Sequence, residues 1–132
     1  MAYTDLFDEI NNCLGVSPTG VIRVQAVTGA NPNILFAIGT IQVSITIFDV
    51  MVQCLFTQGG GTLTVETDIG GLGNLPLTNA MACATDTNVA RTTLIDLTAI
   101  APQDVVGPAD TIEAAKNAAT NVGMVHLVFF LT

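Results

Sequence analysis

The side chains that most often perform chemistry are scarce in this chain. It contains one histidine, one tyrosine and no tryptophan, and its two serines are Ser17 and Ser44. His126 stands alone in an apolar run, so no pair of histidines is present to hold a transition metal. We expect His126 to be a packed or interface residue, and no serine or cysteine triad can be composed. The sequence therefore predicts a protein that is not an enzyme and has no catalytic residues.

Acidic residues in loops are the remaining candidate ligands. Asp86-Thr87-Asn88, and the pair Asp104 and Asp110, offer the oxygens that hard cations prefer, but not with the spacing of an EF-hand. The glycine run at residues 59–61 has no following Lys-Ser/Thr, as a phosphate-binding loop requires. We therefore expect no metal, no cofactor and no small-molecule substrate.

Cys13, Cys54 and Cys83 are an odd number of cysteines with no close pair. This spacing does not indicate a disulfide framework or a zinc site. Buried, reduced thiols that pack as small hydrophobic groups are the simpler interpretation, which favours assembly in a reducing cytosol.

The charge and hydropathy of the chain limit the kinds of macromolecule that it can bind. Of the 132 residues, 11% are charged, against roughly 25% in ordinary soluble domains. The 11 acidic and three basic residues give a net charge of −8, which excludes non-specific nucleic-acid binding and disfavours anionic membranes. Half of the residues are hydrophobic. A small domain of this composition is typical of a subunit that buries apolar surface against neighbouring proteins.

A membrane span is the alternative explanation for the apolar composition. Residues 34–56 are long enough to cross a bilayer as a helix. Residues 41–47, however, alternate apolar and polar side chains with the period of a half-buried strand. We therefore expect no transmembrane helix, and the acidic start of the chain does not resemble a signal peptide.

Residues 1–15 have helical spacing. The apolar residues are Tyr3, Leu6, Phe7, Ile10 and Leu14, with acidic and amide side chains between them and Gly15 at the end. A helix of about three turns is too short to be stable alone, so it must dock on its own domain or on a partner. The two possibilities are left open here. If this arm binds a partner, its interface residues are Tyr3, Leu6, Phe7 and Ile10.

From residue 19 to residue 132 the pattern alternates as in strands, and we expect a single β-sandwich domain. The apolar positions of residues 41–56 change parity near Phe48 and Asp49, which predicts a β-bulge or a bend between sheets. Asp49 is expected to satisfy a backbone group there rather than to mark a site. Residues 58–61 are expected to be a hairpin turn, and residues 70–76 a loop. Residues 110–116 fit a helix or a strand, and the strand is preferred as a hairpin partner of residues 122–131.

The pattern predicts about eight short strands in an antiparallel, jelly-roll-like sandwich with a short N-terminal amphipathic helix. The remaining strands are expected at residues 21–26, 34–38, 62–67, 80–84, 89–97 and 105–106. The run at residues 122–131 is apolar on both faces, as in a central or interface strand.

Residues 20–131 resemble the small β-sandwich auxiliary proteins of tailed-bacteriophage heads, which are decoration, cement or head-fibre proteins. The resemblance is carried by strands and turns rather than by one signature. Its segments are Val21-Ile22-Arg23-Val24, Phe48-Asp49-Val50-Met51-Val52-Gln53-Cys54, the glycine-rich turn before Thr62-Leu63-Thr64-Val65, Asn79-Ala80-Met81-Ala82-Cys83-Ala84, Val89-Ala90-Arg91-Thr92-Thr93-Leu94-Ile95, Gly107-Pro108-Ala109-Asp110-Thr111-Ile112 and Gly123-Met124-Val125-His126-Leu127.

This resemblance implies a jelly-roll-like homotrimer that sits on the capsid surface, binds the major capsid protein and stabilises the assembled head. It carries no catalytic residues, and the N-terminal helix is not part of the shared pattern. A self-polymerising subunit of a tail tube or filament is the alternative, because such subunits are also small, β-rich and adhesive. The expected interface comprises the arm residues and the last strand.

Overall fold

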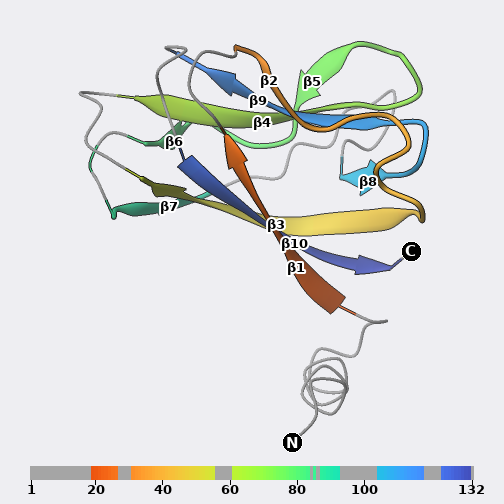
Figure 1. Cartoon of the computed structure of the whole chain (residues 1–132), viewed down its shortest axis with the longest axis horizontal. Helices are drawn as coiled ribbons and strands as arrows, with labels where there is room; N and C mark the ends of the chain where they lie inside the picture. The colour runs from red at the N-terminus through yellow and green to blue at the C-terminus, as the bar shows by residue number, and fades with distance from the viewer. Residues whose placement is uncertain are drawn as a thin grey trace, which may run out of the picture.

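The computed structural model describes residues 19–26, 31–55, 61–83, 85, 87–92, 104–117 and 123–131. These residues form ten strands (Figure 1). Their bounds are β1 Thr19–Ala26, β2 Asn33–Phe36, β3 Ile45–Cys54, β4 Thr62–Asp68, β5 Asn74–Pro76, β6 Met81–Ala82, β7 Val89–Arg91, β8 Val105–Val106, β9 Thr111–Lys116 and β10 Gly123–Leu131.

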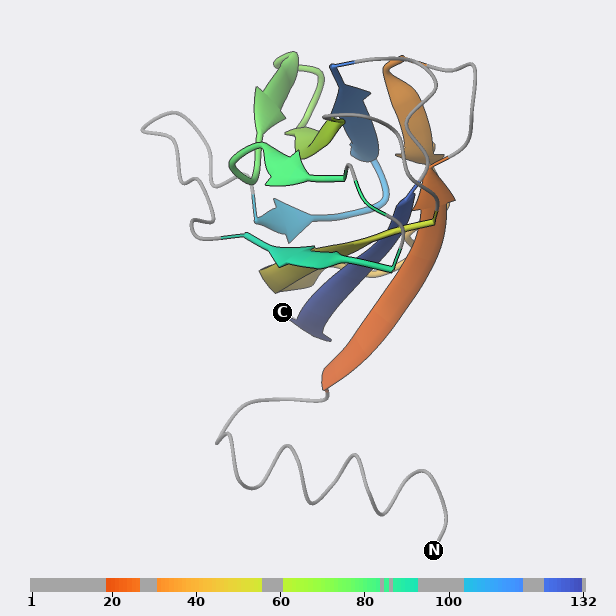
Figure 2. The same cartoon turned by 90° about the vertical axis from the view of Figure 1, so that its left-hand side faces the viewer.

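The strands make two antiparallel sheets. Sheet A has the order β1-β10-β3-β7, with β8 also paired to β3, and sheet B has the order β2-β9-β4-β5, with β6 also paired to β4. The sheets lie as two layers, with β4 and β9 above β3 and β10 in both views (Figures 1 and 2). The prediction of a mainly β, antiparallel, two-sheet protein is confirmed.

The core lies between the two layers because the strands alternate in burial. In β4 the exposure pattern alternates between half-buried and buried along the whole strand, and β3 and β10 do the same over most of their length. Burying one large aliphatic side chain stabilises the fold by about 1.5–3 kcal/mol. Sheet A contributes Ile47, Val50, Val52, Val125 and Leu127, and sheet B contributes Leu63, Val65 and Ile112, all fully buried.

The bulge predicted at Phe48 and Asp49 is present. Val128 of β10 pairs with Asp49 and Phe129 pairs with Ile47, so Phe48 is the extra residue on β3. The backbone N–H of Val50 donates a hydrogen bond of 2.9 Å to Oδ1 of Asp49, as expected for a side chain that satisfies a backbone group at a bulge. The strand itself begins at Ile45, so the prediction that it starts at residue 41 was four residues too early.

The hairpin predicted across residues 58–61 is wrong. β3 belongs to sheet A and β4 to sheet B, so the chain crosses from one layer to the other between them. A run of glycines is compatible with either connection, because it specifies flexibility and not a strand partner. The predicted loop at residues 70–76 is also partly wrong, since residues 74–76 form β5 and pair with the end of β4.

The strand preferred at residues 110–116 is confirmed as β9, but its expected partner is not. β9 lies between β2 and β4 in sheet B, whereas β10 lies in sheet A. The central position expected for the last strand is confirmed, because β10 pairs with β1 on one side and β3 on the other.

Several strand lengths also differ from the expectation. The strands predicted at residues 34–38 and 80–84 cover residues 33–36 and 81–82 in the structure, and the described residues contain ten strands rather than about eight. Residue 122 of the strand predicted at 122–131 lies outside the described residues. The predicted helical arm at residues 1–15 lies outside the described residues, as do residues 93–97 of the predicted strand at 89–97.

Candidate functional site

The face of sheet A that points away from sheet B gathers the side chains of greatest functional interest. We call it the outer face of sheet A. Strand register arranges it in rows that run across the strands. Each row takes one residue from β1, β10 and β3 in that order, and two of the rows continue onto β7. The rows are Val21–Val128–Asp49, Arg23–His126–Met51–Arg91 and Gln25–Met124–Gln53–Val89.

Exposed apolar side chains lie on this face among the polar ones. Val21 and Val89 are 52% and 62% exposed on its two edge strands. Phe48 is turned outward by the bulge and is 39% exposed. The centroid of its ring lies 5.6 Å from the ring centroid of Phe130. The Phe48–Phe130 pair and the two exposed valines are compatible with a surface that binds a partner.

Both arginines of the chain lie on this face, one on each edge strand. Arg23 is on β1 and Arg91 is on β7, with His126 and Met51 between them in a single row. The third basic residue, Lys116, is buried on the inner side of sheet B. In a chain with a net charge of −8, the outer face of sheet A therefore carries nearly all of the accessible positive charge.

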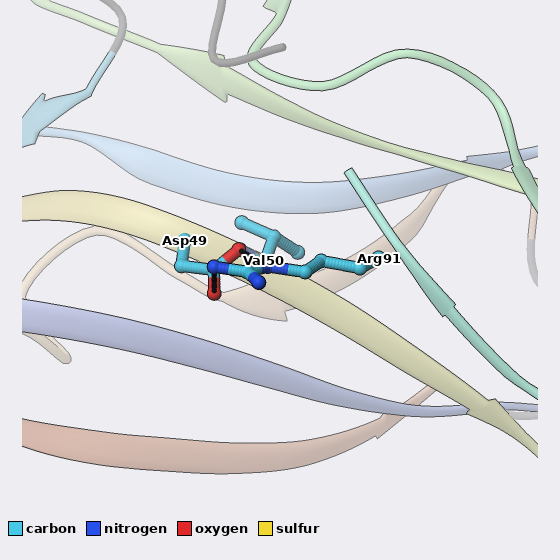
Figure 3. Close-up of polar contacts among 3 residues, drawn as sticks. All are labelled: Asp49, Val50 and Arg91. Atoms are coloured by element: carbon cyan, nitrogen blue, oxygen red, sulfur yellow. Dashed lines mark hydrogen bonds and ion pairs between the residues drawn. The ribbon is translucent and has the colours of Figure 1, made fainter. Parts of the chain in front are cut away.

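Asp49 is the one acidic side chain that the four strands place on this face, and it binds Arg91 (Figure 3). Arg91 Nε donates to Oδ1 at 2.9 Å, and Nη2 lies 2.7 Å from Oδ2. The hydrogen bond to Asp49, and then its negative charge, raise the pKa of Arg91. The pair fixes the position of an arginine whose side chain is still 69% exposed.

His126 lies at the centre of this face on β10. Burial, and then the positive charge of Arg23, lower the pKa of His126 below its ordinary value. Both influences favour the neutral imidazole at neutral pH. The position agrees with the expectation of a packed or interface histidine.

The outer face of sheet B is acidic by contrast. Glu113 of β9 is directly opposite Glu66 of β4, and Asp68 follows two residues later on the same face. Glu113 is 6% exposed and its Oε1 atom has no hydrogen-bond partner among the described residues. Burial, and then the charges of Glu66 and Asp68, raise the pKa of Glu113.

The candidate cation ligands do not form a metal centre in the part of the chain that the structure describes. No group of three histidine, cysteine or acidic side chains is suitably placed there. Asp110 instead orders a loop, because Oδ1 accepts a 2.8 Å hydrogen bond from Gly70 N and Oδ2 accepts one of 2.8 Å from Gly107 N. Asp86 lies outside the described residues.

Cys54 and Cys83 are fully buried and are not joined in a disulfide within the described residues, as expected of cysteines that pack as hydrophobic groups. Cys13 and the expected interface residues Tyr3, Leu6, Phe7 and Ile10 lie outside the described residues. The last strand, which was also expected to bind a partner, contributes the centre of the outer face of sheet A.

Sequence reasoning missed the grouping of Arg23, Arg91 and Phe48 on one face. Alternation along residues 21–26 places Arg23 on the opposite face from Ile22 and Val24, but nothing in the local pattern showed that β1 and β7 belong to the same sheet.

No family model, curated protein or solved structure matches this chain. Within the described ranges, no helix is long and apolar enough to cross a membrane.

Proposed function

We propose that this protein is a virion structural subunit, a decoration or cement protein that binds the assembled head lattice of a tailed bacteriophage and stabilises it. The single observation that supports the proposal is the outer face of sheet A, where Phe48 lies against Phe130 and the exposed valines Val21 and Val89 lie on the two edge strands. In this proposal the sandwich is jelly-roll-like, its partners are the major capsid protein and copies of itself in a homotrimer, and it performs no catalysis.

The physical mechanism is preferential binding to the assembled state. A subunit that binds neighbouring capsomers only when they are joined shifts the equilibrium toward the closed shell by mass action. Many copies acting together make the gain large even where each contact is weak. The two buried cysteines, Cys54 and Cys83, are not joined in a disulfide, which is compatible with assembly in the reducing host cytoplasm before the protein reaches the capsid surface.

The test is co-sedimentation with heads that lack this protein. The double variant Leu6→Asp, Phe7→Asp should leave the sandwich folded and abolish binding, because it removes the apolar side chains of the arm. Val21→Asp should also weaken binding, because it places a charge on an exposed aliphatic position of the outer face of sheet A.

Ile34→Asp is the matched control. Ile34 is 60% exposed on sheet B, so the same change in chemistry is made on the opposite layer, and heads should bind this variant normally. Undiminished binding of both the arm variant and Val21→Asp would overturn the proposal.

A self-polymerising tail-tube or filament subunit is the second candidate, and one observation favours it. β1 has eight residues and no proline, and among the described strands it pairs only with β10, so it is an edge of sheet A. Edges of this kind can accept a strand from another copy. Negative-stain electron microscopy of the protein alone at rising concentration separates the two: small uniform particles support a decoration subunit, and tubes or filaments support a polymer.

A further inference from the structure

The edge of sheet A at β1 is the longest of the described sheet edges. Among the described strands, β1 pairs only with β10, and Figure 2 shows it along one margin of the sandwich. It pairs over its whole length without a register shift and contains no proline or lysine. Natural proteins protect sheet edges with short strands, prolines, lysines or bulges. The outer strands β2, β5, β6, β7 and β8 are only two to four residues long, so β1 alone among the described edges lacks this protection.

The charge along β1 favours a second copy of the chain as its partner. Residues 19–26 contain no acidic side chain, although the chain has 11 acidic residues and a net charge of −8, and Arg23 is their one charged residue. Two copies that approach along β1 therefore bring none of the carboxylates of this strand together. Backbone groups on the outer edge of a strand are satisfied by another strand. An antiparallel pair of identical strands has twofold symmetry, so each favourable contact occurs twice.

The register of such a pair follows from the side chains that it opposes. A twofold axis perpendicular to the sheet keeps the inner faces of both copies on the same side. With Arg23 on this axis, the two arginines would be directly opposite each other, which is destabilising for like charges. With Ile22 on the axis, Arg23 lies opposite the partner's Val21, and residues 19–25 of both strands are paired. With Val24 on the axis, only the described residues 22–26 would pair.

The inner side of β1 supplies an apolar contact in the register with Ile22 on the axis. Ile22 and Val24 are only partly buried and pack against the core. Ile22 would meet the partner's Ile22, and Val24 would lie opposite the partner's Gly20. Gly20 leaves space for the ring of Phe129, because a Cβ there would lie 2.9 Å from Cζ of this ring, which is also only partly buried. The pair would therefore extend the core from one copy to the other.

We propose that two copies of this chain associate through β1, antiparallel and with Ile22 on the twofold axis, so that sheet A continues from one copy into the other. The proposal rests on the proposed association of the protein with copies of itself and deepens it, because it gives the surface and the register. A twofold pair closes on itself and occupies the edge that a filament would need. A trimer contact would use another surface of the subunit.

The sign of a charge placed at Val21 tests this register, because Val21 is 52% exposed and would lie opposite the partner's Arg23. Val21→Glu should lower the Kd of the dimer and Val21→Lys should raise it, each by about 2- to 30-fold, since each variant changes two opposed pairs per dimer. The double variant Val21→Lys, Arg23→Glu should return the Kd close to that of the native protein. Analytical ultracentrifugation of the whole chain over a wide concentration range, without heads, measures the Kd.

Gln25→Glu and Gln25→Lys are the matched controls. Gln25 is also exposed on β1 and, like Val21, is two residues from Arg23, so interactions within one copy are comparable. It would lie opposite residue 19 of the partner, and the sign of its charge should therefore matter little. A sign effect at Gln25 instead of Val21 would overturn the proposed register in favour of one with Val24 on the axis.

The native protein itself should dimerise, and circular dichroism with urea unfolding establishes that each variant is folded. A native protein that stays monomeric at every concentration would overturn the proposal, and so would an equal response to both charges at Val21. Tubes or filaments in place of dimers would overturn it in favour of the second candidate function. The head-binding result is separate, because an acidic residue at position 21 is expected to weaken head binding and to strengthen the dimer.

Discussion

The carboxylate of Asp49 joins two parts of sheet A that are 42 residues apart in sequence, because it binds both its own strand and Arg91 of β7. One oxygen accepts from the Val50 N–H and from Arg91 Nε, each at 2.9 Å. The bulge brings this carboxylate to the surface of the sheet, and the short edge strand β7 supplies the guanidinium.

The hydrogen bond from the Val50 N–H to Asp49 should contribute more to the free energy of unfolding than the ion pair between Asp49 and Arg91. Asp49→Ala should lower the free energy of unfolding by about 1 kcal/mol, because it removes the acceptor for a backbone N–H at the bulge. Arg91→Ala should have a smaller effect, since an exposed ion pair contributes little. Urea unfolding of both variants checks the order. Equal losses would mean that the ion pair, and not the bulge, is the important interaction.

Glu113 should make stability depend on pH. Because its folded pKa is raised, the folded protein binds this proton more tightly than the unfolded chain does. Its contribution is therefore fully present below the ordinary glutamate pKa of about 4.3 and is lost as the pH rises through the raised folded pKa. Glu113→Gln should raise the melting temperature at neutral pH by a few degrees and leave it nearly unchanged at about pH 3.5.

Glu66→Gln serves as the companion variant, since it removes one of the two charges that raise the pKa of Glu113. It should lower the pKa of Glu113 in a carboxyl NMR titration. An unshifted pKa of Glu113 in that variant would assign the raised pKa to burial and Asp68, without a contribution from Glu66.

His126 gives a direct measure of the electrostatics of the outer face of sheet A. Arg23→Gln should raise the pKa of His126, because the positive charge of Arg23 is one cause of its depression. The chain has one histidine, so its imidazole proton resonances can be followed by NMR without ambiguity. Arg91→Gln is the control at the other end of the same row, and it should move the pKa less.

Because its pKa is depressed, His126 should also destabilise the fold in mild acid. The stability associated with its neutral form is present above the unfolded histidine pKa of about 6.5 and is lost as the pH falls through the lower folded value. His126→Gln should remove this part of the pH dependence. Thermal melts between neutral pH and about pH 5 check it, and an unchanged profile would contradict the assignment.

Gly123 should resist substitution more strongly than Gly20. A Cβ at Gly123 would lie 2.7 Å from Cγ2 of Val52 and 3.1 Å from Sγ of Cys83, both of which belong to fully buried residues. Gly123→Ala should therefore cost about 1–3 kcal/mol through overpacking.

At Gly20 the nearest atom is Cζ of Phe129, at 2.9 Å, and this ring is only partly buried. Gly20→Ala should cost less, since the ring has room to shift. Chemical denaturation of the two variants decides the order.

The sequence predicted features that depend on near neighbours. The parity change at Phe48 and Asp49 located the bulge, because period-two burial makes a single inserted residue visible. β-Branched and alternating side chains predicted most of the strands, and Thr111–Lys116 was correctly preferred as a strand.

Features that depend on distant partners were not predictable in the same way. The pattern did not show that β3 and β4 belong to different layers, or that β9 pairs with β2 and β4. Arg91 gave no local sign that it would bind Asp49, because that contact exists only after β7 has paired with β3. Glu113 likewise became notable only when register placed Glu66 opposite it.

The pairing of β1 with β10 has a kinetic consequence. Ile22 is paired with Leu127, so sheet A joins residues about a hundred positions apart in the chain. The entropy of closing so long a loop must be lost before this ladder contributes any stability, and two-state domains with many such contacts fold on the millisecond-to-second scale. Until that ladder forms, β3 and β1 expose edges that nascent chains of the same sequence can join. Refolding yield should therefore decline with protein concentration, and cells that express the protein would benefit from chaperones that keep the nascent chains apart.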